Sequence, residues 1–326
     1  MELIRNFQTV NSILRNKISG KRTPISVNIA LNNNCNFRCT YCSVPNRKQK
    51  EMTTKQIFSL VDELKKASCS RIGLTGGEPM LRDDIGTIIN YIKSKGIITS
   101  MVSNGFITAK YIDKLKNLDF LAISFDGPKK IHDKNRRKGS HDKLLETIKA
   151  ARKIGLNVWS ITVLNKDNVK SVDYVVKKAE ELDFSCFFQP AFEYPMSGSK
   201  VKSIEPIKKD FVQTVNKLIK YKKQGKPINT SDNCLNFFLN YPNFKPNYKC
   251  YAGELFLYID VNGDIHSCFG MMNDVKPVNF LKEGLALDKV KKLPCDGCWC
   301  HTYVELNHIF KFNLKSIKNT LKVVKS

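Results

Sequence analysis

Three cysteines within eight residues are the part of this chain best suited to chemistry: Cys35, Cys39 and Cys42. Thiolates spaced this closely on one loop can bind a single iron–sulfur cluster. Three protein ligands on a four-iron cluster leave one iron open, and an open coordination position distinguishes catalytic from structural metal sites. Structural zinc is the alternative, because the Cys-x2-Cys step from Cys39 to Cys42 is also typical of zinc sites.

Length and cysteine content limit the class of protein. The chain has 326 residues, enough to bury a full core as one large domain with an appendage or as two domains. It contains no run of eighteen apolar residues, and its first residues lack the apolar stretch of a signal peptide. Eleven cysteines without an export signal favour metal ligation in a reducing compartment over disulfides. We therefore expect a cytoplasmic protein.

The net charge is strongly positive, with 54 Lys and Arg against 30 Asp and Glu. Such an excess favours anionic partners: nucleic acid, an acidic membrane surface or phosphorylated substrates. A lysine-rich composition with solvated faces is the alternative. Nucleic acid is disfavoured, because no helix-turn-helix, aromatic-interleaved RNA motif or finger pattern is present.

Short apolar, β-branched runs alternate with longer amphipathic ones from residue 25 onward. The expected strands are 25–31, 71–75, 99–103, 120–125, 158–164 and 186–192. The expected helices are 53–67, 83–95, 108–117, 140–154 and 169–182, with Thr53 and Asp83 as N-caps and Gly96 and Gly155 as C-terminal stops. Six strands joined by crossovers predict an α/β fold, most simply a partial (β/α)6 TIM-like barrel, with a doubly wound sheet as the alternative.

Functional side chains in parallel α/β folds gather at the carboxyl ends of the strands. The first expected strand runs into the cysteine loop, and the second into Gly76-Gly77-Glu78-Pro79. The third ends at Ser103-Asn104 and the fourth at Ser124-Phe125-Asp126. We expect these residues to share one rim, an arrangement that a zinc staple does not need, although the following Gly105 and Gly127 alone would indicate only turns.

Together these residues resemble the radical S-adenosylmethionine (SAM) superfamily. The Cys-x3-Cys-x2-Cys loop, with Tyr41 before its last cysteine, matches the superfamily signature, and the Gly-Gly-Glu-Pro run matches its second-strand motif. The resemblance covers roughly residues 20–192 as a core. It implies that Cys35, Cys39 and Cys42 hold a 4Fe-4S cluster whose open iron chelates SAM.

The resemblance also implies which residues bind the cofactor. Gly76, Gly77 and Glu78 would receive the methionyl amino group, since a backbone without Cβ permits a close approach. The other expected cofactor-binding residues are Tyr41, Ser103, Asn104, Ser124, Asp126 and Arg136. Arg136 would pair with the cofactor carboxylate, with its neighbour Arg137 or plain surface charge as the alternatives.

The implied chemistry belongs largely to the cofactors. An electron from the cluster cleaves SAM, and the resulting 5′-deoxyadenosyl radical abstracts hydrogen from a C–H bond. The protein orients the reactants and excludes water and oxygen. A reducing partner such as flavodoxin or ferredoxin is expected to supply the electron.

A second cysteine group follows, between residues 250 and 300. Alternating apolar residues around Asn262-Gly263 predict a β-hairpin that brings Cys250 and Cys268 together. This region resembles the SPASM extension or its shorter twitch form, which binds auxiliary clusters. A full SPASM extension supplies seven cysteines and only five are present here, so the resemblance implies one auxiliary 4Fe-4S cluster. Its expected ligands are Cys250, Cys268, Cys295 and Cys298.

Four cysteines are not assigned to either cluster, and zinc is an alternative to the second cluster. Cys300 would be a spare, a substitute ligand or a structural thiol. Zinc remains the alternative for the whole extension, because a hairpin plus Cys-x2-Cys also describes a zinc ribbon. Cys69, Cys186 and Cys234 are expected to be buried thiols without a direct role.

Amphipathic segments with lysines and arginines occur at both ends of the chain. The expected units are an N-terminal amphipathic helix (1–24), the radical SAM core (25–205), a helical connector (206–249) and the twitch/SPASM-like extension with a C-terminal basic helix (250–326). Docking of both terminal helices on the barrel is the ordinary interpretation. Peripheral contact with an anionic membrane, at its inner face, is the alternative and would indicate a lipid-linked substrate.

We therefore expect a radical SAM enzyme that acts on a small-molecule, cofactor-precursor or lipid-linked substrate. Only about two dozen residues precede the first expected strand, too few for the winged-helix domain that binds peptides in many maturases with this extension. Ribosomal peptide modification is the second hypothesis. A basic, zinc-binding module without catalytic activity is the third.

Overall fold

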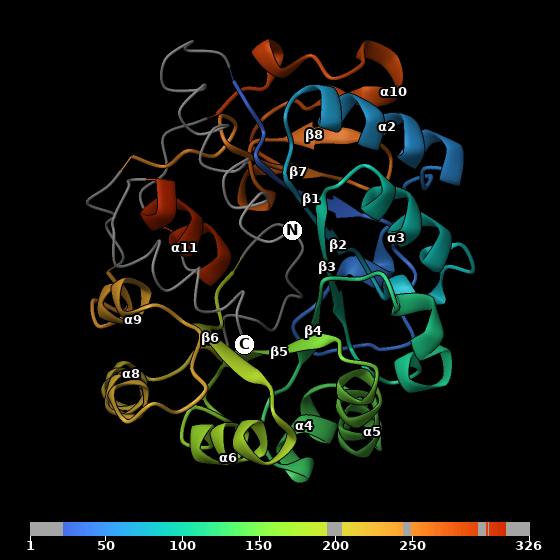
Figure 1. Cartoon of the computed structure of the whole chain (residues 1–326). Helices are drawn as coiled ribbons and strands as arrows, with labels where there is room; N and C mark the ends of the chain where they lie inside the picture. Colours follow the sequence, from blue (N-terminus) through green and yellow to red (C-terminus); the bar gives the residue numbers. More distant parts are fainter. Residues whose placement is uncertain (1–21, 194–203, 244–248, 293–297, 299, 311–326) are drawn as a thin grey trace.

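A single curved sheet forms the centre of the molecule (Figure 1). The structure, a computed structural model, describes residues 22–193, 204–243, 249–292, 298 and 300–310. Within these residues the sheet has nine strands in the order β6-β5-β4-β3-β2-β1-β7-β8-β9. Their bounds are β1 Ser26–Ala30, β2 Arg71–Thr75, β3 Ile98–Ser103, β4 Phe120–Ser124, β5 Asn157–Leu164, β6 Ser185–Pro190, β7 Phe256–Ile259, β8 Asp264–His266 and β9 Val278–Asn279.

Strands β1 to β6 pair in parallel and in sequence order, which confirms the predicted α/β fold with a partial barrel. The sheet is not closed: β6 and β9 are its two edges. The helices that cover its outer face are α2 Thr54–Lys66, α3 Ile85–Ser94, α4 Lys129–Asn135, α5 Ser140–Lys153 and α6 Val172–Leu182. The connector contributes α8 Lys208–Lys223 and α9 Asp232–Phe238.

Two helix predictions need correction. The segment from Thr108 to Leu115 is a 3-10 helix (η3), kinked at Tyr111, instead of an α-helix. Asp83 is not an N-cap, because α3 begins at Ile85 and the carboxylate of its N-cap residue, Asp84, binds Arg82. The Thr53 cap is confirmed, with a reciprocal capping box to Gln56.

One hydrophobic core joins the sheet to the helices. On α2, Ile57, Leu60, Val61 and Leu64 recur at helical spacing and are all buried against the sheet. The same core continues to Phe211 on α8 and to residues of the connector, the hairpin and the last described helix. Burial of each such side chain contributes roughly 1.5–3 kcal/mol.

The extension continues the sheet of the core. Strand β7 pairs in parallel with β1, with Tyr258 opposite Asn28. Strands β7 and β8 form the predicted hairpin, with Tyr258 opposite His266. The chain then runs through η4 Phe269–Met271, β9, α10 Phe280–Glu283 and η5 Leu287–Lys289 to α11 His301–Phe310. Helix α11 lies beside α9, near β6 and the open side of the barrel (Figure 1).

Several predicted features lie outside the described residues. They are the N-terminal helix except for residues 22–24, Cys295, and the C-terminal basic helix beyond Phe310. Among the helices that the structure does describe, none has the length and apolar character needed to cross a membrane.

Candidate active site

The cysteine loop leaves the carboxyl end of β1 and closes at α2. The Cys42 N–H donates to the Cys39 carbonyl at 3.1 Å, which makes the end of the motif a tight turn. The Phe37 N–H points at Cys35 Sγ (3.4 Å), and the buried Phe37 ring packs edge-on against Phe106. All three thiols are partly buried. The loop therefore presents three sulfurs from a fixed backbone.

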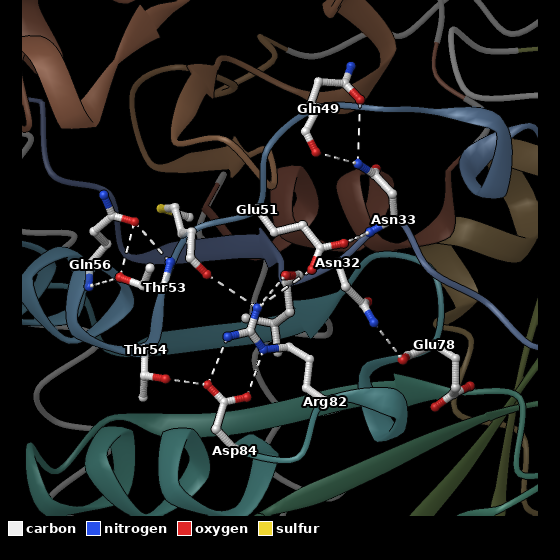
Figure 2. Close-up of polar contacts among 12 residues, drawn as sticks. Asn32, Asn33, Gln49, Glu51, Thr53, Thr54, Gln56, Glu78, Arg82 and Asp84 are labelled. Carbon is white, nitrogen blue, oxygen red and sulfur yellow. Dashed lines mark hydrogen bonds and ion pairs between the residues drawn. The ribbon is translucent and has the colours of Figure 1, made fainter.

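Arg82 holds both ends of this loop, as Figure 2 shows. Its Nη1 donates to the Leu31 carbonyl (3.0 Å), where β1 ends, and to the Met52 carbonyl (3.3 Å), just before α2. Asp84 fixes the guanidinium with two hydrogen bonds of 2.8 Å. Sequence reasoning missed Arg82, whose role depends on the positions of two carbonyls in distant segments.

The glycines after β2 are required by the cysteine loop. A Cβ on Gly76, whose φ is +130°, would lie 2.4 Å from the Asn32 carbonyl oxygen. A Cβ on Gly77 would lie 2.1 Å from the Asn34 carbonyl oxygen. The Gly77 N–H instead donates to the Asn32 carbonyl at 2.7 Å. Direct backbone contact with the loop is thus what the two glycines permit here.

Glu78, in the segment after β2, joins that segment to the end of β3. Its Oε1 accepts from the Ser103 hydroxyl (2.9 Å) and the Met80 N–H (3.1 Å), and its Oε2 accepts from the Asn104 N–H (2.7 Å). The Asn104 Nδ2 donates to Asn36 Oδ1 (2.7 Å) inside the cysteine loop. Burial raises the pKa of Glu78 to about 7, against the effect of these hydrogen bonds. The predicted meeting of Glu78, Ser103 and Asn104 at one rim is therefore observed.

Asp126 and Arg136 form a buried pair beside the cysteine motif. Two hydrogen bonds of 2.9 Å join the guanidinium to the carboxylate. The Tyr41 hydroxyl donates to the same carboxylate (3.2 Å), and Arg136 lies 5.7 Å above the Tyr41 ring. Arg136 is thus held by Asp126, which leaves both N–H groups of Nη1 and the second N–H of Nη2 for the cofactor carboxylate that the resemblance assigned to it.

Two further predicted residues lie at this edge of the sheet. Ser124 is half-buried at the end of β4. Arg137 is exposed, donates to the Asn36 carbonyl (2.9 Å) and lies over the Phe106 ring. Their cofactor contacts remain predictions.

His132 was missed as part of this site. It is fully buried, and its Nδ1 accepts from the Asp126 N–H at 3.2 Å. Burial lowers the pKa of His132 to about 3, so the ring is neutral. Because it fixes the Asp126 backbone, His132 positions the Asp126–Arg136 pair. The His-x3-Arg spacing was visible in the sequence, but the hydrogen bond to a strand-end amide was not.

The donor set at the cysteine loop fits a thiolate-bound cluster. Burial raises the pKa of Cys35 and Cys42, and raises that of Cys39 to about 12, so free thiols would stay protonated. A bound metal displaces those protons. In the described residues no three Cys, His, Asp or Glu side chains converge on a single ion.

Two buried amide groups beside the loop also fit a bound group. Asn32 Oδ1 and Asn36 Nδ2 have no hydrogen-bond partner among the described residues. Asn32 Oδ1 would lie only 3.1 Å from a Cβ on Gly76, so it faces the bend where the resemblance placed an amino group. An acceptor and a donor buried without partners are costly unless a ligand satisfies them.

The extension gathers four described cysteines around α11. Cys250, Cys268, Cys298 and Cys300 pack in one cluster with Tyr303 and Phe256. Burial, together with the other three of these thiols, raises the pKa of Cys298 well above its usual value. Three of the four predicted auxiliary ligands are thus close together, and the fourth, Cys295, lies outside the described residues.

Asn307 contacts the first of these cysteines. It is fully buried on α11, and its Oδ1 accepts from the Tyr251 N–H at 2.8 Å. This bond fixes the orientation of the amide, so Nδ2 points at Cys250 Sγ (3.6 Å). Among the described residues, Cys69, Cys186 and Cys234 are buried free thiols, as predicted.

The fold and site define a partial α/β-barrel protein with a loop of three partly buried thiols at the carboxyl ends of its parallel strands. The Radical SAM superfamily model matches residues 29–179, a stretch that includes the cysteine loop and the glycine bend, and proteins of this superfamily are enzymes. One similar protein is the Fe-coproporphyrin III synthase of Methanosarcina barkeri, with 28% identity over 51% of this chain and 44% of the relative. Another is a probable GTP 3′,8-cyclase of Methanococcus maripaludis, with 30% identity over 44% of this chain and 50% of the relative. The chain thus spans about half the length of these two relatives.

Two comparisons extend over more of the chain. The mycofactocin maturase MftC of Mycolicibacterium smegmatis is 24% identical over 81% of this chain and 69% of its own. The structure of Streptococcus suis SuiB bound to S-adenosylmethionine superposes with a TM-score of 0.70 at 18% identity, over 85% of this chain and 68% of SuiB. At this identity the superposition shows the fold, the partial barrel included.

Proposed function

We propose that this chain is a radical SAM enzyme in which Cys35, Cys39 and Cys42 hold a 4Fe-4S cluster. The observation that carries the proposal is the bonding of the cysteine loop to the Gly76-Gly77-Glu78 bend, beside two buried amide atoms, Asn32 Oδ1 and Asn36 Nδ2, that have no hydrogen-bond partner among the described residues. When bound, the cluster supplies one electron to SAM, which releases methionine and a 5′-deoxyadenosyl radical that removes a hydrogen atom from the substrate.

The chain's own residues would orient SAM. Asn32 Oδ1 would accept from its amino group at the glycine bend, and the free Nη1 of Arg136 would donate to its carboxylate. Glu78 is already occupied by three donors, so it would act by fixing the Ser103 and Asn104 strand end. Tyr41, through its bond to Asp126, would keep the cysteine turn and the Arg136 pair together.

We propose further that the extension binds one auxiliary 4Fe-4S cluster, through Cys250, Cys268, Cys298 and either Cys295 or Cys300. The shared packing of the four described thiols around α11 supports this ligand set. Such a cluster would accept an electron from the substrate or bind the substrate directly. Structural zinc is the competing occupant.

For the substrate there are two candidates. The names of a coproporphyrin synthase and a GTP cyclase among the relatives support a small molecule or cofactor precursor. The comparisons that extend over more than four fifths of the chain include a maturase and a SuiB structure bound to a precursor peptide. Because these matches span more than the barrel, they favour a peptide substrate.

Iron and sulfide analysis after anaerobic reconstitution tests the cluster assignment. We expect about eight iron and eight sulfide per chain, about four after Cys39→Ala, and about four after Cys268→Ala. Zinc without acid-labile sulfide would contradict the proposal. The substrate test uses a short precursor peptide encoded by a gene adjacent to the gene for this chain. The peptide should change in mass when it is incubated with the enzyme, whereas an unchanged mass would favour the small-molecule candidate.

A further inference from the structure

Exposed cations surround the cysteine loop. We define the cationic rim as Arg38, Lys48, Lys50, Arg137 and Lys138, all of them exposed. Arg38 lies within the cysteine motif and donates to the Cys35 carbonyl at 2.7 Å. Arg137 comes from the segment after α4 and reaches the Asn36 carbonyl at 2.9 Å. Two distant segments thus place an arginine on the backbone of the cysteine motif.

Lys48 and Lys50 lie on the returning part of the loop. They flank Gln49, whose backbone and side-chain oxygens both accept from the Asn33 amide (Figure 2). Asn33 in turn is only two residues before Cys35. These contacts hold the two lysines beside the start of the motif.

No carboxylate in the part of the chain that the structure describes forms an ion pair with the rim. In the described residues, Lys48, Lys50 and Lys138 form no ion pair, whereas many exposed lysines elsewhere pair with a nearby acid, as Lys66 does with Glu63 and Lys143 with Glu146. Glu51, the acid next to the rim, accepts from the Asn33 N–H and lies 3.9 Å from Arg82. Asp133 is occupied by the N–H groups of Gly139 and His141.

We propose that the cationic rim is the docking surface for an acidic one-electron carrier protein. The inference rests on the proposed function, because only a redox cluster at the cysteine loop gives such a carrier something to reduce. An acidic protein attracted to the rim would bind over the cysteine loop, and its redox group would then lie near the proposed cluster. Complementary charge raises association rates by about 10- to 1,000-fold at low salt.

The surroundings of the rim favour a carrier protein over a membrane or nucleic acid. The large exposed hydrophobic side chains of the described residues are Tyr111, Ile154, Ile207 and Leu281. None belongs to the cysteine loop or to the segment of Arg137 and Lys138, although Leu281 lies near Met52 at the end of the loop. Membrane-surface segments insert apolar side chains between their cations, and single-stranded nucleic acid stacks on exposed aromatic rings. The rim offers charge alone, which suits a transient electron-transfer encounter.

The opposite face of the molecule provides a matched control. Helices of a parallel α/β fold return to the amino ends of the strands, so the last turns of α2 and α5 lie away from the cysteine loop. Lys65, Lys149 and Lys153 are exposed there and form no ion pair with other described residues. Reversal of these three charges changes the net charge as much as reversal of Lys48, Lys50 and Lys138.

The test compares two triple variants of the full chain with reconstituted clusters. The rim variant is Lys48→Glu/Lys50→Glu/Lys138→Glu, and the control is Lys65→Glu/Lys149→Glu/Lys153→Glu. Stopped-flow absorbance gives the second-order rate of cluster reduction by a reduced acidic flavodoxin, at low salt and at about 0.5 M salt. Titanium(III) citrate serves as a reductant that needs no docking.

We expect the rim variant to be reduced by flavodoxin at least about tenfold more slowly at low salt, with little salt dependence left. The control should stay within about twofold of the unmodified protein, and titanium should reduce all three equally. Equal flavodoxin rates for the two variants would overturn the proposal. So would rim-dependent binding to anionic phospholipid vesicles or single-stranded RNA with unchanged flavodoxin rates.

A measurement without a cluster separates this inference from the proposed function. Carbodiimide cross-linking of the as-purified chain to flavodoxin, mapped by mass spectrometry, should join Lys48, Lys50 or Lys138 to flavodoxin carboxylates. Cross-links at these lysines with no iron uptake would contradict the proposed function alone. Iron uptake with cross-links only at lysines elsewhere would contradict the docking surface alone.

Discussion

Arg47 in the cysteine loop forms a buried ion pair with Asp260, the last residue before the β7–β8 turn. The pair is bidentate, with Nη1 3.0 Å from Oδ1 and Nη2 bonded to Oδ2. The Arg47 side chain is 15% exposed and that of Asp260 is 3% exposed. The Met52 N–H adds a backbone bond of 2.7 Å to the Val261 carbonyl. The extension therefore braces the loop that carries the first three cysteines.

Asp260→Asn should destabilise the fold, because it leaves the Arg47 charge buried without a counter-charge. We expect the free energy of unfolding, measured in urea, to fall by about 3 kcal/mol. The matched control is Glu146→Gln, which breaks an exposed pair with Lys143 and should cost less than about 1 kcal/mol. Equal losses for the two variants would contradict a bracing role.

Gly77→Ala should remove the first cluster. Its Cβ would lie 2.1 Å from the Asn34 carbonyl oxygen, so the cysteine loop must move. Iron content should fall by about four per chain while the auxiliary cluster remains. Gly155→Ala is the control: with a φ of +75° and no atom within 4 Å, it should cost about 1 kcal/mol and no iron. Full iron content in Gly77→Ala would show that the loop does not need this contact.

The free energy of unfolding should fall as the pH drops from about 6.5 towards 3, because the buried His132 ring stays neutral in the folded protein. Burial holds its pKa at about 3, with Asp126 and Asp133 opposing the shift and Arg136 and His141 adding to it. Between these pH values the unfolded chain binds the extra proton, so the unfolding free energy should drop by about 2 kcal/mol at pH 5. The variant His132→Asn, which can still accept a hydrogen bond from the Asp126 N–H, should not show this loss of unfolding free energy at low pH. Urea curves at pH 8 and pH 5 measure it, and identical pH dependence in both proteins would contradict the assignment.

Asn307→Leu should lower the reduction potential of the proposed auxiliary cluster. An N–H group directed at a ligand sulfur stabilises the reduced cluster, and Asn307 Nδ2 is so directed at Cys250. An electron paramagnetic resonance redox titration measures both clusters, and the first serves as the internal control. An unchanged auxiliary potential, with iron content retained, would show that Cys250 is not a cluster ligand.

Much of the fold and part of the site could be predicted from the sequence. The alternation of β-branched and amphipathic runs predicted the six parallel strands, and the Gly76-Gly77 pair was expected to let the backbone approach the cofactor amino group. The close contact of these glycines with the Asn32 and Asn34 carbonyls was not predicted, because it depends on how two loops pack. The same holds for Arg82 and Arg47, because the carbonyls that Arg82 contacts and the Asp260 carboxylate that Arg47 contacts come from other segments of the chain.

The pairing of Arg136 shows a different limit. Motif resemblance assigned both Arg136 and Asp126 to the cofactor, as separate contacts. The structure joins them through two 2.9 Å hydrogen bonds. Spacing in a sequence indicates which residues lie near a site, but not which of them satisfy one another.

Anaerobic SAM cleavage tests the central claim most directly. With dithionite and SAM, the reconstituted protein should form 5′-deoxyadenosine and methionine in equal amounts, and Cys39→Ala should form neither. The control variant Cys69→Ala, which changes a buried thiol outside the motif, should retain the activity if it folds. No 5′-deoxyadenosine from a protein with full iron content, or equal amounts from Cys39→Ala, would contradict the account.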